Sequence, residues 1–155
     1  MFNYAIINND FSFRNGVYYM KKYDLIDHTA DVGIKAYGKT LSEAFENAAK
    51  GMFDIITDNS EVESTGQYNI ELKASDLEQL LVDWLSKLLY LNDAQDLVFG
   101  KFEVTLSGNH LSANVYGEKY DKKKHGMGVE IKAVTYHMLQ VHETNPIFVQ
   151  VLFDI

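Results

Sequence analysis

The sequence predicts an α+β fold in which two main helices pack on a largely antiparallel sheet, in a two-layer arrangement. Two segments, 41–56 and 77–91, carry apolar residues at helical spacing, and each follows a helix-capping pattern. Several other segments alternate apolar and polar residues, and turn-forming residues join two of these segments directly. Strands therefore outnumber helices and are connected in part by hairpins, which favours the α+β class.

Length and composition restrict what the protein can be. The chain has 155 residues, of which 46% are hydrophobic, with a net charge of −8 and no cysteine. These values predict one folded domain without disulfides, thiolate nucleophiles or cysteine-based zinc sites. No run of 18 apolar residues and no signal-like start is present, so we expect a cytoplasmic protein without membrane contact. The negative charge disfavours stand-alone binding of DNA or RNA through phosphates.

The first nineteen residues differ from the rest of the chain. Residues 1–19 are rich in Asn, Phe and Tyr without a clear period, whereas Met20 is followed by what looks like a natural protein start. We therefore interpret 1–19 as an N-terminal extension or a mis-assigned start, and 20–155 as a single domain. The alternative is a genuine extra strand from Val17 to Met20.

A polar turn leads directly into a strand after residue 31. An imidazole, a hydroxyl and a carboxylate lie within four residues, on His28, Thr29 and Asp31. Apolar and other residues then alternate from Val32 to Tyr37, the period of a half-buried strand. Because binding chemistry is often found where loops meet strands, this turn is a candidate site.

Both helices have clear start signals. Thr40–Glu43 forms a capping box before the first amphipathic helix, which Asp58, Asn59 and Ser60 end. Ser75–Glu78 forms a second capping box, which opens a more heavily apolar helix ending near Asn92 and Asp93. The width of the second apolar stripe predicts that much of this helix is buried.

The remaining segments predict strands and loops. Alternation predicts a strand around 68–72 and a hairpin of 102–106 with 111–115. Residues 117–128 are predicted to form a polar, mobile loop, and the scattered histidines to be mostly loop or surface residues. Residues 129–141 are ambiguous between a strand and a short helix that gives way to a strand near Met138. The last strand is expected to bury Ile147, Val149, Val151 and Phe153.

The chain ends on two neighbouring carboxylates, the side chain of Asp154 and the α-carboxylate of Ile155. If the strand that begins at Val32 pairs with this last strand, Asp31 and Asp154 meet at one edge of the sheet. Such a set offers only hard oxygen ligands, which suit Ca²⁺, Mg²⁺ or Mn²⁺, and a contribution from His28 or His137 would favour Mn²⁺ or Zn²⁺. The alternative is that Asp31 forms a turn and Asp154 is a solvated terminal acid.

Several motifs together resemble the archease family. They comprise His28–Gly38, Leu41–Phe45, Leu80–Leu85, Gly117–Glu118, Ile131–His137 and Phe153–Ile155, in that order. The resemblance covers about Lys21 to Ile155 and leaves residues 1–19 outside.

The resemblance implies an accessory protein rather than an enzyme. Archeases activate RtcB-type RNA ligases in tRNA splicing and RNA repair, promoting guanylylation of the ligase and multiple turnover. The family's metal site corresponds to Asp31, Asp154 and Ile155 here, with Ca²⁺ the ion most expected and Mg²⁺ or Mn²⁺ possible. His28, Lys132 and His137 are expected as second-shell or partner contacts. The expected partner is the ligase, with tRNA contacted only indirectly.

Two other function classes compete with this expectation. A metal-dependent phosphoester hydrolase could use the same acids, although the sequence contains no enzyme motif and only His28 or His137 could serve as its base. A general chaperone or interaction module would make the acids incidental.

Overall fold

The computed structural model describes residues 11–14, 17–28 and 30–155, and the side chains of residues 11–20 and of His28 lie outside this description. Within these residues the chain forms helices and antiparallel sheets, which confirms the predicted α+β class. In the described part of the chain, no helix is long and apolar enough to cross a membrane.

A five-stranded antiparallel sheet contains both ends of the predicted domain. Its strands are β3 (Tyr23–His28), β4 (Asp31–Tyr37), β8 (Ala133–Val134), β9 (Gln140–His142) and β10 (Phe148–Asp154). The order is β3-β4-β10-β8, and β9 also pairs with β10. The last strand of the chain therefore lies inside the sheet, between β4 on one side and β8 and β9 on the other. Strand β3 was not predicted.

Strand β10 is buried along most of its length. The predicted core face is confirmed at Val149, Val151 and Phe153, which are fully buried. Leu152 on the opposite face is also fully buried, and Phe148 nearly so. The prediction that only one face of this strand is buried was therefore incomplete, because both faces are largely covered.

A second, three-stranded antiparallel sheet has the order β5-β7-β6. Its strands are β5 (Gly66–Lys73), β6 (Leu97–Ser107) and β7 (His110–Lys119). The predicted hairpin is confirmed as β6–β7, whose tight turn places Gly108 at a φ of 57°. Glycine adopts this left-handed conformation without a steric penalty.

The two main helices are α2 (Leu41–Ile56) and α3 (Leu77–Gln95). Thr40 caps α2 by accepting the N–H of Glu43 at 3.1 Å, as predicted. The cap of α3 is Asp76, which accepts the N–H of Gln79 at 2.8 Å, one residue later than the predicted cap at Ser75. Either residue type can cap a helix, so local sequence could not decide between them.

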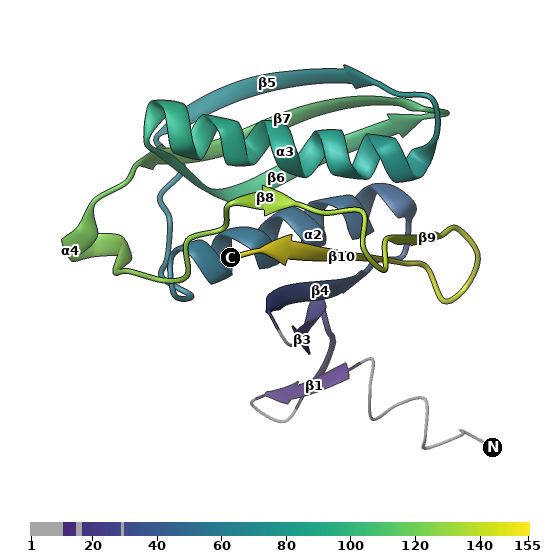
Figure 1. Cartoon of the computed structure of the whole chain (residues 1–155). Helices are drawn as coiled ribbons and strands as arrows, with labels where there is room; N and C mark the ends of the chain where they lie inside the picture. Colours follow the sequence, from purple (N-terminus) through teal and green to yellow (C-terminus); the bar gives the residue numbers. More distant parts are fainter. Residues whose placement is uncertain (1–10, 15–16, 29) are drawn as a thin grey trace.

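The helices join the two sheets into one core. Helix α2 packs on β4 and β10 on one side and on β6 on the other, and α3 lies along the three-stranded sheet (Figure 1). Trp84 of α3 is fully buried and donates its indole N–H to the carbonyl of Phe45 in α2 at 3.0 Å. This bond joins the two helices at the centre of the core.

Three other predictions are answered by the structure. The extra strand from Val17 to Met20, given above as the alternative for the N-terminal region, is present. It is β2 (Val17–Met20), which pairs with β1 (Phe11–Arg14). Whether translation begins at Met20 stays a prediction. Residues 129–141 contain β8, a turn and the start of β9, and no helix lies within this described segment. The loop predicted over 117–128 instead holds the end of β7 and a short helix, α4 (Lys122–His125).

Candidate functional site

Asp31 and Asp154 lie directly opposite each other in neighbouring strands. Asp31 begins β4, Asp154 ends β10, and the register of the two antiparallel strands pairs them. The strand pairing that the site hypothesis required is therefore confirmed. Residues paired in this way share one face of the sheet, with Cβ atoms about 4.5–5.5 Å apart.

The backbone of Asp154 is also held by β8 and the residue before it. The N–H of Lys132 donates to the carbonyl of Asp154 at 2.7 Å, and Ala133 is the register partner of Asp154 in β8. Ile155 follows at the end of the chain and is 40% exposed. The backbone of Asp154 is therefore held by the sheet, and Ile155 beside it is exposed.

The charges at this edge favour a cation. Like charges directly opposite each other on one face of a sheet are destabilising, and a bound cation removes the repulsion. Carboxylate oxygens are the ligands that Ca²⁺ and Mg²⁺ prefer. Among the described residues, no three His, Cys, Asp or Glu side chains are grouped closely enough to hold a metal. The carboxylates of Asp31 and Asp154 are the hard oxygen ligands that such a cation takes, and the cation site with the terminal carboxylate of Ile155 stays a prediction.

The residues predicted as second-shell or partner contacts are Lys132, His28 and His137, and the structure describes them to different extents. Lys132 is exposed, and its backbone contacts Asp154. His28 is the register partner of Asp31 in β3, but its side chain lies outside the described residues, and Thr29 lies outside entirely. His137 is exposed on the turn after β8, where its N–H donates to the hydroxyl of Thr135 at 3.3 Å.

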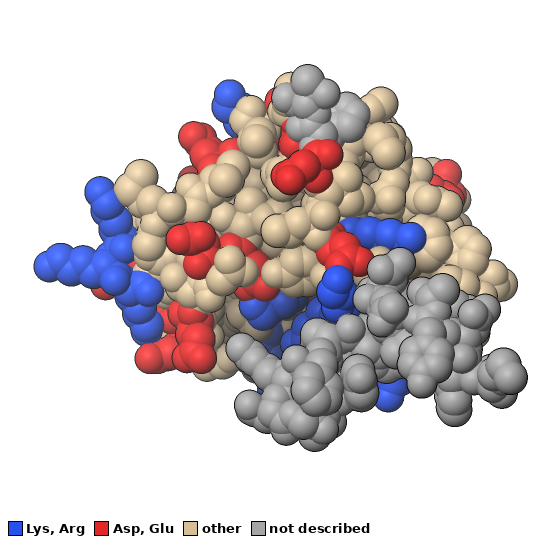
Figure 2. Space-filling view, turned by 90° about the horizontal axis from the view of Figure 1, so that it is seen from below, with Lys and Arg blue, Asp and Glu red and all other residues tan. Residues whose placement is uncertain are grey.

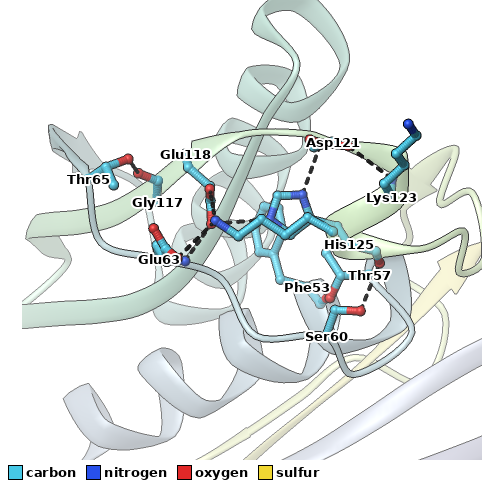
Figure 3. A network of polar contacts seen from close by, with 11 residues as sticks. Phe53, Thr57, Ser60, Glu63, Thr65, Gly117, Glu118, Asp121, Lys123 and His125 are labelled. Atoms are coloured by element: carbon cyan, nitrogen blue, oxygen red, sulfur yellow. Dashed lines mark hydrogen bonds and ion pairs between the residues drawn. The ribbon is translucent and has the colours of Figure 1, made fainter.

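Helix α4 is held by a buried histidine that the sequence analysis expected to be a loop or surface residue. His125 is fully buried, and its Nδ1 accepts the N–H of Asp121 at 2.9 Å (Figure 3). Its ring stacks on Tyr120, and its carbonyl accepts the hydroxyl of Ser60 at 2.9 Å. The prediction of a mobile 117–128 loop was therefore wrong. Asp121 before the helix and Gly126 after it are capping signals that could have revealed it.

Glu118 connects this helix to the loop before β5. It accepts the ammonium of Lys124 at 2.7 Å and the backbone N–H of Glu63 at 2.6 Å (Figure 3). The Nε2 atom of His125 lies 3.2 Å away, near enough for attraction but without hydrogen-bond alignment. Burial alone would raise the pKa of Glu118, but these donors and the Lys124 charge outweigh burial and hold the pKa at about 2.

This low pKa predicts a specific dependence of stability on pH. Glu118 contributes stability that is fully present above its ordinary pKa of 4.5 and is lost as the pH falls toward about 2. We expect the free energy of unfolding of the wild type to fall more steeply over this range than that of Glu118→Gln. Urea titrations at several pH values measure the difference. Glu143→Gln, at an exposed side chain between β9 and β10, is the matched control and should follow the wild type; equal slopes for Glu118→Gln and the wild type would contradict the prediction.

Comparison with known proteins identifies close relatives. The sequence profile of the archease protein family matches residues 23–155. Protein archease of Methanosarcina barkeri is 46% identical over 129 residues, covering 80% of this chain and 88% of the relative. That of Sulfolobus acidocaldarius is 41% identical over 132 residues, covering 84% and 95%.

Solved structures agree with these sequence matches. The solution structure of Methanobacterium thermoautotrophicum protein 1598 is similar with a TM-score of 0.72 at 35% identity, covering 88% of this chain and all of that one. A Thermotoga maritima crystal structure, described as an archease and possible chaperone, has a TM-score of 0.54 at 20% identity, covering 88% and 98%, and supports the fold alone.

Proposed function

Because the chain belongs to the archease family, we propose that it is an accessory protein that activates an RtcB-type RNA ligase and is not itself an enzyme. In this proposal it promotes guanylylation of the ligase and lets the ligase turn over repeatedly during tRNA splicing and RNA repair. The working location would be the cytoplasm, and the protein would act on tRNA only through the ligase.

The observation that carries the proposal is the register pairing of Asp31 with Asp154 beside the chain terminus. Two strands fix the backbone of Asp154, and the Lys132 N–H holds its carbonyl. These residues would hold a divalent cation, with Ca²⁺, Mg²⁺ and Mn²⁺ as candidates. The cation would supply positive charge to phosphate groups during guanylylation. The role of the chain itself is to fix the carboxylates at an exposed edge that a partner can reach.

The charge of the protein supports a protein partner over direct RNA binding. Its net charge is −8, whereas enzymes that hold RNA through phosphates present basic surfaces. Opposite charges increase the rate and specificity of protein association. An acidic accessory protein therefore complements an RNA ligase.

RNA ligation with limiting ligase tests the proposed function. The substrate carries a 2′,3′-cyclic phosphate on one fragment and a 5′-hydroxyl on the other, and product is counted per ligase molecule. We expect about one product per ligase without this protein and many with it, because each turnover needs a new guanylylation. Equal product with and without the protein would overturn the proposal.

A general interaction module is the second candidate function. Seven large apolar side chains of the described residues are exposed, including Met127 at 69%. Ligase stimulation that survives the loss of Asp31 would favour this candidate.

A further inference from the structure

We propose that Leu25, Met127 and Val129 form a docking surface, here called the apolar patch, for a basic protein surface bearing apolar anchor residues. The proposal rests on the proposed function, since the occupant we assign is the cognate RNA ligase. It adds which surface holds the ligase and which chemistry that surface recognises.

The apolar patch exposes more apolar side chain than a free protein surface favours. Met127 is 69% exposed, Leu25 is 61% exposed and Val129 is 43% exposed. Scattered exposed apolar residues are ordinary, but neighbouring ones within a polar rim mark interaction sites. These three are neighbours, because Val129 lines one hollow with Met127 and a second hollow with Leu25.

The two hollows provide space for anchor side chains. The first measures about 300 Å³ and has Ile56 and Tyr120 in its wall, and the second measures about 200 Å³ and has Val32 and Ile55. Such volumes accept one or two large side chains of a partner. Gly128 and Val129 separate the hollows, so one docked segment could fill both.

Acidic side chains surround these hollows. Asp93, Asp96 and Glu130 line the first, and Asp54 and Asp58 line the second. Burial and the nearby charge of Glu130 both raise the pKa of Asp93, as expected where two carboxylates lie close together. A lysine or arginine at this place would relieve that repulsion. The occupant is therefore basic, in addition to its apolar anchors.

The backbone of the apolar patch is hydrogen-bonded to the end of α2. The N–H groups of Gly128 and Val129 donate to the carbonyls of Ile56 and Ile55 at 3.2 and 3.0 Å. The segment then continues to Lys132, which bonds the Asp154 carbonyl. A ligase held at the apolar patch would therefore lie next to the Asp31–Asp154 edge, with little ordering cost on this side.

Helix α4, which directly precedes Met127 of the apolar patch in the chain, carries three lysines. Figure 2 shows basic side chains projecting at the left edge, where Figure 1 has α4, with acidic side chains across the neighbouring surface. Lys122 and Lys123 are exposed, and Lys124 is paired with Glu63 and Glu118. The surface at α4 is therefore positive and borders an acidic region. A basic partner would be repelled by the first and attracted by the second, which would orient it on the acidic region.

Binding of the cognate ligase to the full chain tests the proposal. We would measure the dissociation constant of wild type and of Met127→Ser/Val129→Ser by calorimetry at several salt concentrations. We expect the double variant to bind at least about tenfold more weakly, because interface centres carry most of the binding energy. Asp93→Asn/Glu130→Gln should lower the dependence of affinity on salt, since two charges leave the interface.

Tyr136→Ser is the matched control. Tyr136 is 61% exposed, and its hydroxyl contacts Gln79 near the start of α3. Asp93 lies fourteen residues further along the same helix, roughly 20 Å away at the usual rise per residue. Because Tyr136 also stands next to His137, an expected partner contact, the control should lose far less affinity than the double variant.

The outcomes separate this proposal from the proposed function. If the double variant binds as tightly as the wild type, and wild type still stimulates ligation, the docking surface is wrong and the activator role stands. If Tyr136→Ser weakens binding as much as the double variant, the assignment to the apolar patch is also wrong. If wild type neither binds nor stimulates the ligase, both proposals fall.

Discussion

Replacing Asp31 or Asp154 by asparagine is expected to reduce multiple-turnover ligation to the level seen without the protein. The amide keeps the shape of the side chain but removes the charge that a hard cation requires. Because the two residues are register partners at one edge, either change should have nearly the full effect and the double variant should add little. Ligation with limiting ligase measures the loss.

A second readout separates the metal site from other roles of these residues. Excess Ca²⁺ should raise the melting temperature of the wild type, because a ligand of the folded state stabilises it. The asparagine variants should show a much smaller rise. Glu78→Gln, which removes one exposed charge from the first turn of α3, should behave like the wild type in both assays. Full stimulation by the folded asparagine variants would show that the metal site is not the working part.

Trp84→Ala is expected to be the most destabilising single change in the core. Trp84 is fully buried and packs edge-on against Phe102, with ring centroids 6.3 Å apart. Truncation would leave a large cavity and remove the indole hydrogen bond to the Phe45 carbonyl, at a cost of about 3–5 kcal/mol. Urea denaturation followed by circular dichroism measures the change in the free energy of unfolding.

Trp84→Phe is the matched control for that prediction. It keeps much of the ring volume but removes the indole N–H that the carbonyl of Phe45 accepts. We expect a loss of about 1–3 kcal/mol, from the lost hydrogen bond and the smaller ring. If both variants lose the same amount, cavity formation is not the main cost of truncation.

The local elements could be predicted from neighbouring residues alone. The helix starts, the β6–β7 hairpin and the strand from Val32 to Tyr37 depend on capping groups, turn residues and periodicity within a few positions. The carboxylates at Asp31 and Asp154 could be singled out for the same reason, since each stands at the end of a predicted strand. Their functional role stays a prediction that the ligation and calcium experiments test.

Burial of His125 could not be predicted from its neighbours. The residues around it are lysines and glycines, which indicate an exposed loop. Its burial depends on Tyr120, on Ser60 from before β5, and on the carboxylate of Glu118. Local polarity therefore misled the prediction, because a polar segment is anchored here by a few contacts from other parts of the chain.

The sequence by itself determined the two main helices, the β6–β7 hairpin, the fold class and the identity of the acids at two strand ends. Only the tertiary structure decided that β10 lies between β4 and β8, which brings Asp31 and Asp154 together and buries Leu152 on the second face. The physical reason is that helix caps and turns involve groups close in the chain. Strand order and burial instead depend on which distant surfaces are removed from water together.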